Sequence, residues 1–220
     1  AEYMGIYLKI PKGMNILTGQ YTAPGTIDLV LKRTVFKSRS LFNVTDSVGE
    51  LLFKVRNRLF SWLTETIVIL DANGNPIATI REKVGKWYAY KGESISKTDR
   101  IFTAKHHWSF SSKTRMDVFL ENNKCKEGCD FMVKQSGCGV DCKIYAGSVE
   151  ESNALVACIN GEGTLKSCFL GENKLFCKIA PNVDQAFVVA LYVIMEEDTR
   201  AHVQWHTFND TRSRARTSIR

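Results

Sequence analysis

The sequence predicts an all-β domain with one buried helix: about twelve strands closed into a barrel around a hydrophobic C-terminal helix. Three observations lead to this prediction. Residues 186–195 form the longest uncharged apolar run of the 220-residue chain, short strand-like segments precede it at close intervals, and no linker rich in Pro, Gly or Ser divides the chain. As a helix the run would rise about 15 Å, half the hydrocarbon thickness of a bilayer, so it belongs inside a protein.

The helix is expected at residues 183–198. Its apolar run is rich in Val and Ile and would also suit a buried strand, so the ends of the segment decide. Pro181 stops the preceding strand, Asn182 is the expected N-cap, and Asp184 lies in the positive first turn. The three acids at 196–198 are unfavourable at a helix C-terminus. A helix that is apolar on every side must be surrounded, here by strands.

Most of the chain before this helix alternates between apolar and polar residues, the period of a half-buried strand. Two hairpins stand out because Asp and Gly mark their turns, at residues 46–49 and 71–74. About a dozen strands fit a closed barrel, which has no exposed edges and leaves room for a helix inside. The expected strand segments are 27–33, 41–45, 51–55, 67–70, 77–80, 86–91, 100–105, 115–120, 129–134, 142–146, 154–159 and 174–179.

The chain is expected to form one domain with two flanking segments. We expect an irregular lead-in at residues 1–26, the barrel domain at 27–200, and a basic, flexible tail at 201–220. A hydrophobic content of 44% is sufficient for a full core. Seven cysteines, an odd number, favour a reducing compartment. No signal peptide or spanning segment is recognisable, so we expect a cytoplasmic protein that works in the cytosol, at a membrane surface or in the nucleus.

Four cysteines lie within 18 residues at a spacing that a structural zinc site would permit: Cys125, Cys129, Cys138 and Cys142. Two of them open expected strands, as small semi-buried residues do, so we favour structural or loop thiols over zinc or a reversible disulfide. We therefore expect no metal and no cofactor. His106 and His107 are interpreted as a strand end. No nucleophile, base and orienting group occur together, so the residues do not indicate an enzyme.

The charge of the chain is unevenly distributed. Of the net +7, residues 1–58 carry nine Lys/Arg against four Asp/Glu and residues 211–220 carry four Arg, which leaves the remainder at −2. A basic patch in the first part suits an anionic surface, either lipid headgroups or nucleic acid. The alternative is a solvated face without a partner, and the tail is expected to be disordered rather than a dedicated site. The candidate lipid-binding residues are Lys32, Arg33, Lys37, Arg39, Lys54, Arg56 and Arg58.

Seven short motifs, in order between residues 27 and 200, resemble the plant LURP-one-related proteins. The motifs are FNVTD at 42–46, GELLFKV at 49–55, LDANGNP at 70–76, MDVFL at 116–120, CDF at 129–131, YAG at 145–147 and PNVD at 181–184. The resemblance implies the tubby C-terminal-like fold, a twelve-stranded barrel around a hydrophobic C-terminal helix, which tubby proteins and phospholipid scramblases share. The tail and the pair Cys125/Cys138 depart from the pattern of the family.

For function, the resemblance implies a link to plant defence and identifies no catalytic residues. Tubby domains bind membrane phosphoinositides through basic residues, but that site is not aligned with positions of this chain. We therefore expect a monomeric, non-catalytic binding module that acts as a phospholipid or phosphoinositide adaptor. The alternative is a regulatory scaffold that binds protein or DNA, in the manner of a membrane-tethered transcription regulator like tubby.

Overall fold

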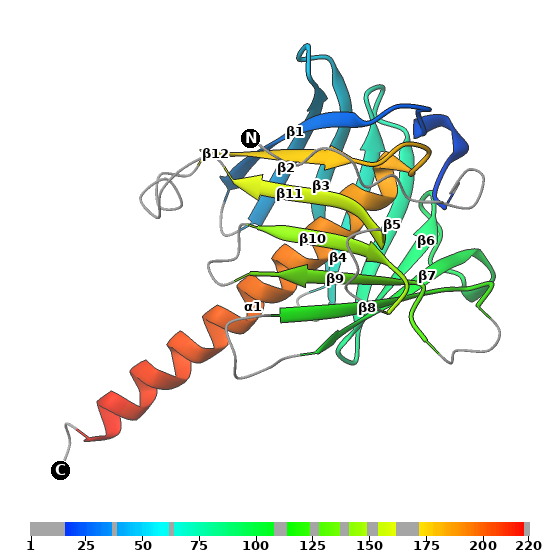
Figure 1. Ribbon diagram of the computed structural model, residues 1–220. Coiled ribbons are helices and arrows are strands. Elements are labelled where there is room, and N and C mark those ends of the chain that lie inside the picture. Colours follow the sequence, from blue (N-terminus) through cyan, green and yellow to red (C-terminus); the bar gives the residue numbers. More distant parts are fainter. Residues whose placement is uncertain are drawn as a thin grey trace.

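The computed structural model describes residues 16–36, 39–61, 64–107, 114–123, 128–136, 141–148, 154–161 and 172–217. These residues form a closed antiparallel barrel of twelve strands that encloses the first part of one long helix (Figure 1). The predicted fold class is confirmed.

The strands follow one another around the barrel in sequence order, and β1 closes the ring by pairing with β12. This closure gives every strand two hydrogen-bonded neighbours and leaves no open edge. Two short 3-10 helices are also present, η1 (Gly19–Tyr21) and η2 (Lys97–Asp99). The strands are β1 (Ile27–Phe36), β2 (Arg39–Asp46), β3 (Leu51–Ser61), β4 (Thr64–Asp71), β5 (Pro76–Lys83), β6 (Lys86–Lys91), β7 (Arg100–His107), β8 (Thr114–Leu120), β9 (Phe131–Gln135), β10 (Cys142–Ala146), β11 (Leu155–Gly161) and β12 (Glu172–Ile179).

The two predicted hairpins are present and use the expected turn chemistry. In the β2–β3 turn, Asp46 Oδ1 accepts hydrogen bonds from the backbone N–H groups of Val48 and Glu50 at 3.0 and 2.8 Å. In the β4–β5 turn, Asp71 Oδ1 accepts one from Asn75 N–H at 2.8 Å. Each turn also contains a glycine with positive φ, 95° at Gly49 and 91° at Gly74, which a residue with a Cβ rarely adopts.

The helix α1 (Gln185–Thr217) fills the barrel with its first three turns. Every side chain at positions 186–195 is 2% exposed or less. Phe187 packs edge-on against Phe102 of β7 and Phe131 of β9, with ring centroids 5.4 and 4.9 Å apart. On the opposite side of the barrel, the ring of Tyr192 packs edge-on against that of Phe42 of β2, with the centroids 6.0 Å apart. The inward side chains of the strands and this helix therefore form one core.

The helix begins two residues later than the pattern predicted, at Gln185 instead of residue 183. Its N-cap is Asp184, whose Oδ1 accepts a hydrogen bond from Phe187 N–H at 3.1 Å and whose carbonyl accepts one from Val188 N–H at 3.2 Å. Asn182, the expected cap, instead adopts a left-handed φ of 60°. Asn tolerates this conformation better than most residues, so it turns the chain into the helix rather than capping it.

At its other end, α1 continues past the expected boundary at residue 198, through most of the segment that was predicted to be a flexible tail. Figure 1 shows this part leaving the barrel as an extended helix. The acids at 196–198 are therefore interior to the helix, where the unfavourable interaction with the C-terminal end of the dipole does not apply.

The end of the lead-in is attached to the helix start. Asp184 Oδ2 accepts three hydrogen bonds, at 3.2, 2.7 and 3.0 Å, from the backbone N–H groups of Ile16, Leu17 and Thr18. The side chains of Ile16 and Leu17 also pack against the core. Residues 16–26 thus have a defined position, although apart from η1 they form no regular helix or strand, and residues 1–15 lie outside the described part of the chain.

Candidate functional site

The outer surface of β1, β2 and β3 carries three of the predicted basic residues. Lys32 and Arg56 are exposed and Lys54 is half-buried. The register places Lys32 opposite Asn43 and Asn43 opposite Lys54, so these side chains form one row across three strands. Arg56 follows Lys54 on the same side of β3, because side chains alternate along a strand. We call Lys32, Lys54 and Arg56 the basic face.

The basic face is not neutralised by neighbouring acids. Among the residues that the structure describes, no Asp or Glu pairs with Lys32, Lys54 or Arg56, and Lys54 Nζ has a carbonyl oxygen, that of Ala72, at 3.5 Å. Two arginines elsewhere on the barrel surface are paired: Arg115 donates to Asp117 at 2.7 Å, and Arg100 donates to Glu121 at 2.7 and 2.8 Å. The positive potential therefore remains available on the β1–β3 side.

Arg33 does not lie on the basic face, in contrast to the prediction. Leu29, Leu31 and Arg33 occupy alternate positions of β1, and all three face the inside of the barrel. Arg33 Nη1 donates to Glu196 Oε1 of α1 at 2.5 Å. Of the other predicted residues, Lys37 lies outside the described residues, and so do the side chains of Arg39 and Arg58.

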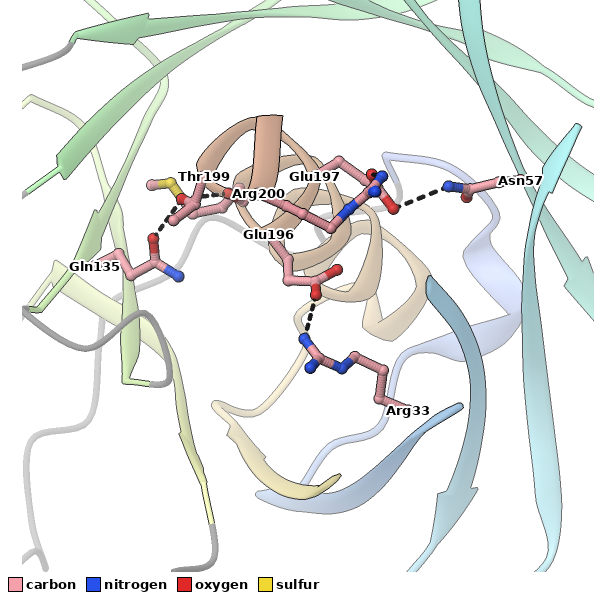
Figure 2. A network of polar contacts seen from close by, with 8 residues as sticks. Arg33, Asn57, Gln135, Glu196, Glu197, Thr199 and Arg200 are labelled. Atoms are coloured by element: carbon pink, nitrogen blue, oxygen red, sulfur yellow. Dashed lines mark hydrogen bonds and ion pairs between the residues drawn. The ribbon is translucent and has the colours of Figure 1, made fainter. Parts of the chain in front are cut away.

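Arg33 belongs to a ring of polar contacts at the end of the barrel where α1 leaves it (Figure 2). Each of four consecutive helix residues contacts a different strand. Glu196 meets Arg33 of β1, Glu197 Oε1 accepts from Asn57 of β3 at 2.9 Å, Asp198 pairs with His106 of β7, and Thr199 Oγ1 donates to Gln135 of β9 at 2.8 Å. Arg200 pairs back onto Glu197. We call these nine residues the exit collar.

The strand members of the exit collar all continue the inward row of their strand. Inward positions are apolar deep in the barrel and become polar at the exit, as in Phe53, Val55 and then Asn57. The same change occurs in β7 at His106 and in β9 at Gln135. The collar therefore closes the exit end of the core with hydrogen-bonded groups, which fixes the rotation of α1 relative to the strands.

The electrostatics of the exit collar depend on burial. Burial raises the pKa of Glu196, and the charge of Arg33 opposes the rise. Glu197 is fully buried and is held by Asn57 and Arg200. Because removal of one partner from a buried ion pair leaves an uncompensated charge, these contacts specify the position of the helix more than they add to stability.

The thiols and imidazoles do not assemble into a metal site in the described residues. Burial raises the pKa values of the thiols of Cys129, Cys142 and Cys177, and a thiol must lose its proton to bind a metal. Cys125 and Cys138 lie outside the described residues, so the interpretation of the four cysteines as structural or loop thiols stays a prediction. His106 faces inward to Asp198, whereas its neighbour His107 faces outward to Asp117 at 3.0 Å, so the two rings diverge.

Comparison with known proteins identifies the family. A family model described as LURP-one-related matches residues 27–196, which is the barrel and the enclosed part of α1. The chain belongs to the LURP-one-related family. Among its relatives in Arabidopsis thaliana, protein LURP-one-related 15 is 37% identical over 190 residues, 84% of this chain and 86% of the relative. Protein LURP-one-related 10 is 36% identical over 193 residues, 85% of this chain and 97% of the relative.

A solved structure supports the same fold. The X-ray structure of an Arabidopsis thaliana protein matches with a TM-score of 0.63 and 34% identity, over 84% of this chain and 98% of that chain. In the described residues of this LURP-one-related chain, no helix is both long and apolar enough to cross a membrane.

Proposed function

We propose that this LURP-one-related protein is a non-catalytic module that binds anionic membrane surfaces reversibly through the basic face. The observation that carries the proposal is the row from Lys32 to Lys54, continued by Arg56, with no acidic partner in the described residues. The buried titratable groups of the exit collar are engaged in holding α1, which is a structural rather than a chemical task.

The expected strength of this interaction follows from the number of charges. Each Lys or Arg near an anionic leaflet contributes about 1 kcal/mol, so three together contribute about 3 kcal/mol, roughly two orders of magnitude in affinity. Salt weakens the attraction because the side chains act across solvent. The binding is therefore weak, reversible and suited to an adaptor that moves between the membrane and the cytosol.

The test compares two triple variants in co-sedimentation with phosphoinositide-containing vesicles. The first variant carries Lys32→Glu, Lys54→Glu and Arg56→Glu. The matched control carries Lys83→Glu, Lys86→Glu and Lys105→Glu, a row of exposed lysines on β5, β6 and β7. Each variant replaces three positive charges with three negative ones, so both move the formal net charge from +7 by −6 to +1.

The proposal expects the first variant to lose binding by about 100-fold or more and the control to bind nearly as the parent does. Both should melt cooperatively like the parent, because the replaced side chains point away from the core. Equal losses in the two variants would show that net charge alone governs binding. If the parent protein does not bind vesicles but binds DNA in a salt-dependent way, the regulatory scaffold is favoured instead.

A further inference from the structure

β12 exposes an aromatic side chain in the middle of a strand. Phe176 is 45% exposed, between Leu175 and Cys177, which face the core. The other large hydrophobics that are exposed in the described residues lie in turns or loops: Val48, Val84 and Ile95. A single exposed apolar residue needs no explanation, so the surroundings of Phe176 decide whether it has a role.

Lysines surround Phe176 on the outer surface. Lys174 and Lys178 are its outward neighbours on β12, and both are exposed. Across the ladder to β1, Phe176 faces Val30 and Lys174 faces Lys32. Like charges directly opposite each other destabilise a sheet. The Lys32–Lys174 pair is therefore unfavourable in the free protein, and an anion between the two ammonium groups would relieve this repulsion.

Acids compensate little of this charge. The carboxylate of Asp28 lies 3.7 Å from Lys178 Nζ, but the side chains are 61% and 64% exposed, and such surface pairs contribute little. In the described part of the chain, neither Lys32 nor Lys174 pairs with an acidic side chain. The surface thus combines an apolar centre with a cationic rim. Lys32 also belongs to the basic face, so the two surfaces are continuous around the barrel.

We propose that Phe176 inserts into the boundary between headgroups and acyl chains of an anionic leaflet, while Lys32, Lys174 and Lys178 contact the lipid phosphates around it. The proposal rests on the proposed function and extends it from the basic face to β12. A membrane surface presents anionic groups directly above apolar chains, which matches lysines placed around an aromatic ring. Soluble inositol phosphates would satisfy the lysines and leave Phe176 in water.

The first experiment measures binding of Phe176→Ser to vesicles of phosphatidylcholine, phosphatidylserine and phosphoinositide. Because Phe176 is only partly buried by insertion, the expected loss is about tenfold. The loss should remain as salt is raised, since apolar contact is not screened by ions. The matched control is Ile95→Ser, which removes an apolar side chain that is 58% exposed in the loop after β6, and it should bind as the parent does.

The second experiment reports insertion directly. Phe176→Trp is mixed with vesicles that contain brominated lipid, and its fluorescence is compared with that of the parent, which has four tryptophans of its own. The added tryptophan should shift to the blue and be quenched on anionic vesicles, with no such change on pure phosphatidylcholine.

The outcomes separate this inference from the proposed function. A parent that fails to bind anionic vesicles overturns both. A parent that binds, with Phe176→Ser binding equally and the fluorescence of Phe176→Trp unquenched, overturns the insertion and leaves binding by the basic face intact. Stacking of single-stranded nucleic acid on Phe176, with vesicle binding unaffected by its removal, overturns the membrane assignment of this surface.

Discussion

Asp184 holds two parts of the molecule together, the start of α1 and the end of the lead-in, with one carboxylate. Its Oδ1 caps α1 at Phe187 N–H, and its Oδ2 receives three backbone N–H groups of the lead-in. Burial raises the pKa of Asp184, and the hydrogen bonds from these N–H groups oppose the rise. A helix N-terminus and a loop that meet at a single charged acceptor depend strongly on that acceptor.

We predict that Asp184→Ala lowers the free energy of unfolding by about 2–4 kcal/mol, because it removes a helix cap and leaves partly buried N–H groups without an acceptor. The stability of Asp184→Asn should lie between those of Asp184→Ala and the parent. Its single carbonyl oxygen can accept either from the helix N-terminus or from the lead-in, but not from both. Urea unfolding provides the measurement. A loss for Asp184→Ala of less than about 0.5 kcal/mol would place these hydrogen bonds among interactions that water replaces easily.

The raised pKa of Glu196 should make the stability of the protein depend on pH. Burial raises its pKa above the ordinary value near 4.5, so the folded chain holds the proton more tightly than the unfolded chain. The stabilisation from this proton is present at acid pH and is lost as the pH rises from about 4.5 through the raised pKa. Glu196→Gln cannot ionise, so its stability does not fall in this way as the pH rises.

The stability of Glu196→Gln relative to the parent should therefore improve as the pH rises from about 4 to about 7. Urea unfolding of both proteins at several pH values isolates the effect, because all other carboxylates cancel in the difference. A relative stability that instead worsens with rising pH would mean that the ion pair with Arg33 outweighs burial and lowers the pKa of Glu196.

At the scale of elements, α1 is the part on which every strand depends. Leu191 is fully buried in the middle of the enclosed segment. We predict that Leu191→Asp prevents folding, because it combines the loss of a core side chain with a charge that is buried on all sides, a cost comparable to the whole stability of a domain. Ala190→Arg should do the same for reasons of volume and charge. Far-UV circular dichroism and thermal melting measure the outcome.

The control for this prediction is Val48→Asp, in the β2–β3 turn, where the side chain is 81% exposed. It should melt within a few degrees of the parent, since surface substitutions usually change stability by about 0.5 kcal/mol or less. If Leu191→Asp also melts like the parent, the helix is peripheral and the barrel folds without it.

The strands and the enclosed helix could be predicted from the sequence because their signals are local. Alternation identified the strands, Asp and Gly identified two hairpin turns, and the apolar run at 186–195 required a surrounding shell. The inward position of Arg33 could also have been predicted, because Arg33 follows Leu29 and Leu31 at alternate positions of the same strand. Clustering by charge alone placed it on the wrong side of β1.

The exit collar could not be predicted in the same way. Its central ion pair joins residues 163 positions apart, and no local pattern connects them. The acids at 196–198 were interpreted as an unfavourable helix end, because their partners on three strands could not be seen in the sequence. The continuation of α1 to Thr217 was missed for the same reason, since a helix that leaves a core loses the apolar periodicity by which sequence patterns recognise it.

At the scale of the whole molecule, the barrel has cations on several sides, and some of them are paired with acids. On β7 and β8, Asp117 pairs with Arg115 and His107. The β12–β1–β2–β3 side presents Lys174, Lys32 and Lys54 in one row that includes Asn43. The closed sheet fixes the strands that carry this row, so the proposed membrane binding would present these lysines together, which a flexible basic tail would not ensure.

The most direct measurement of this orientation is lysine-reactive labelling of the intact protein, read by mass spectrometry with and without anionic vesicles. The account predicts that Lys32 and Lys54 become protected on phosphoinositide vesicles and stay reactive on phosphatidylcholine. Lys86 and Lys105, exposed on β6 and β7 across the barrel, should stay reactive on both. Protection of Lys86 and Lys105 with Lys32 and Lys54 unchanged would contradict the assignment of the basic face as the membrane-binding surface.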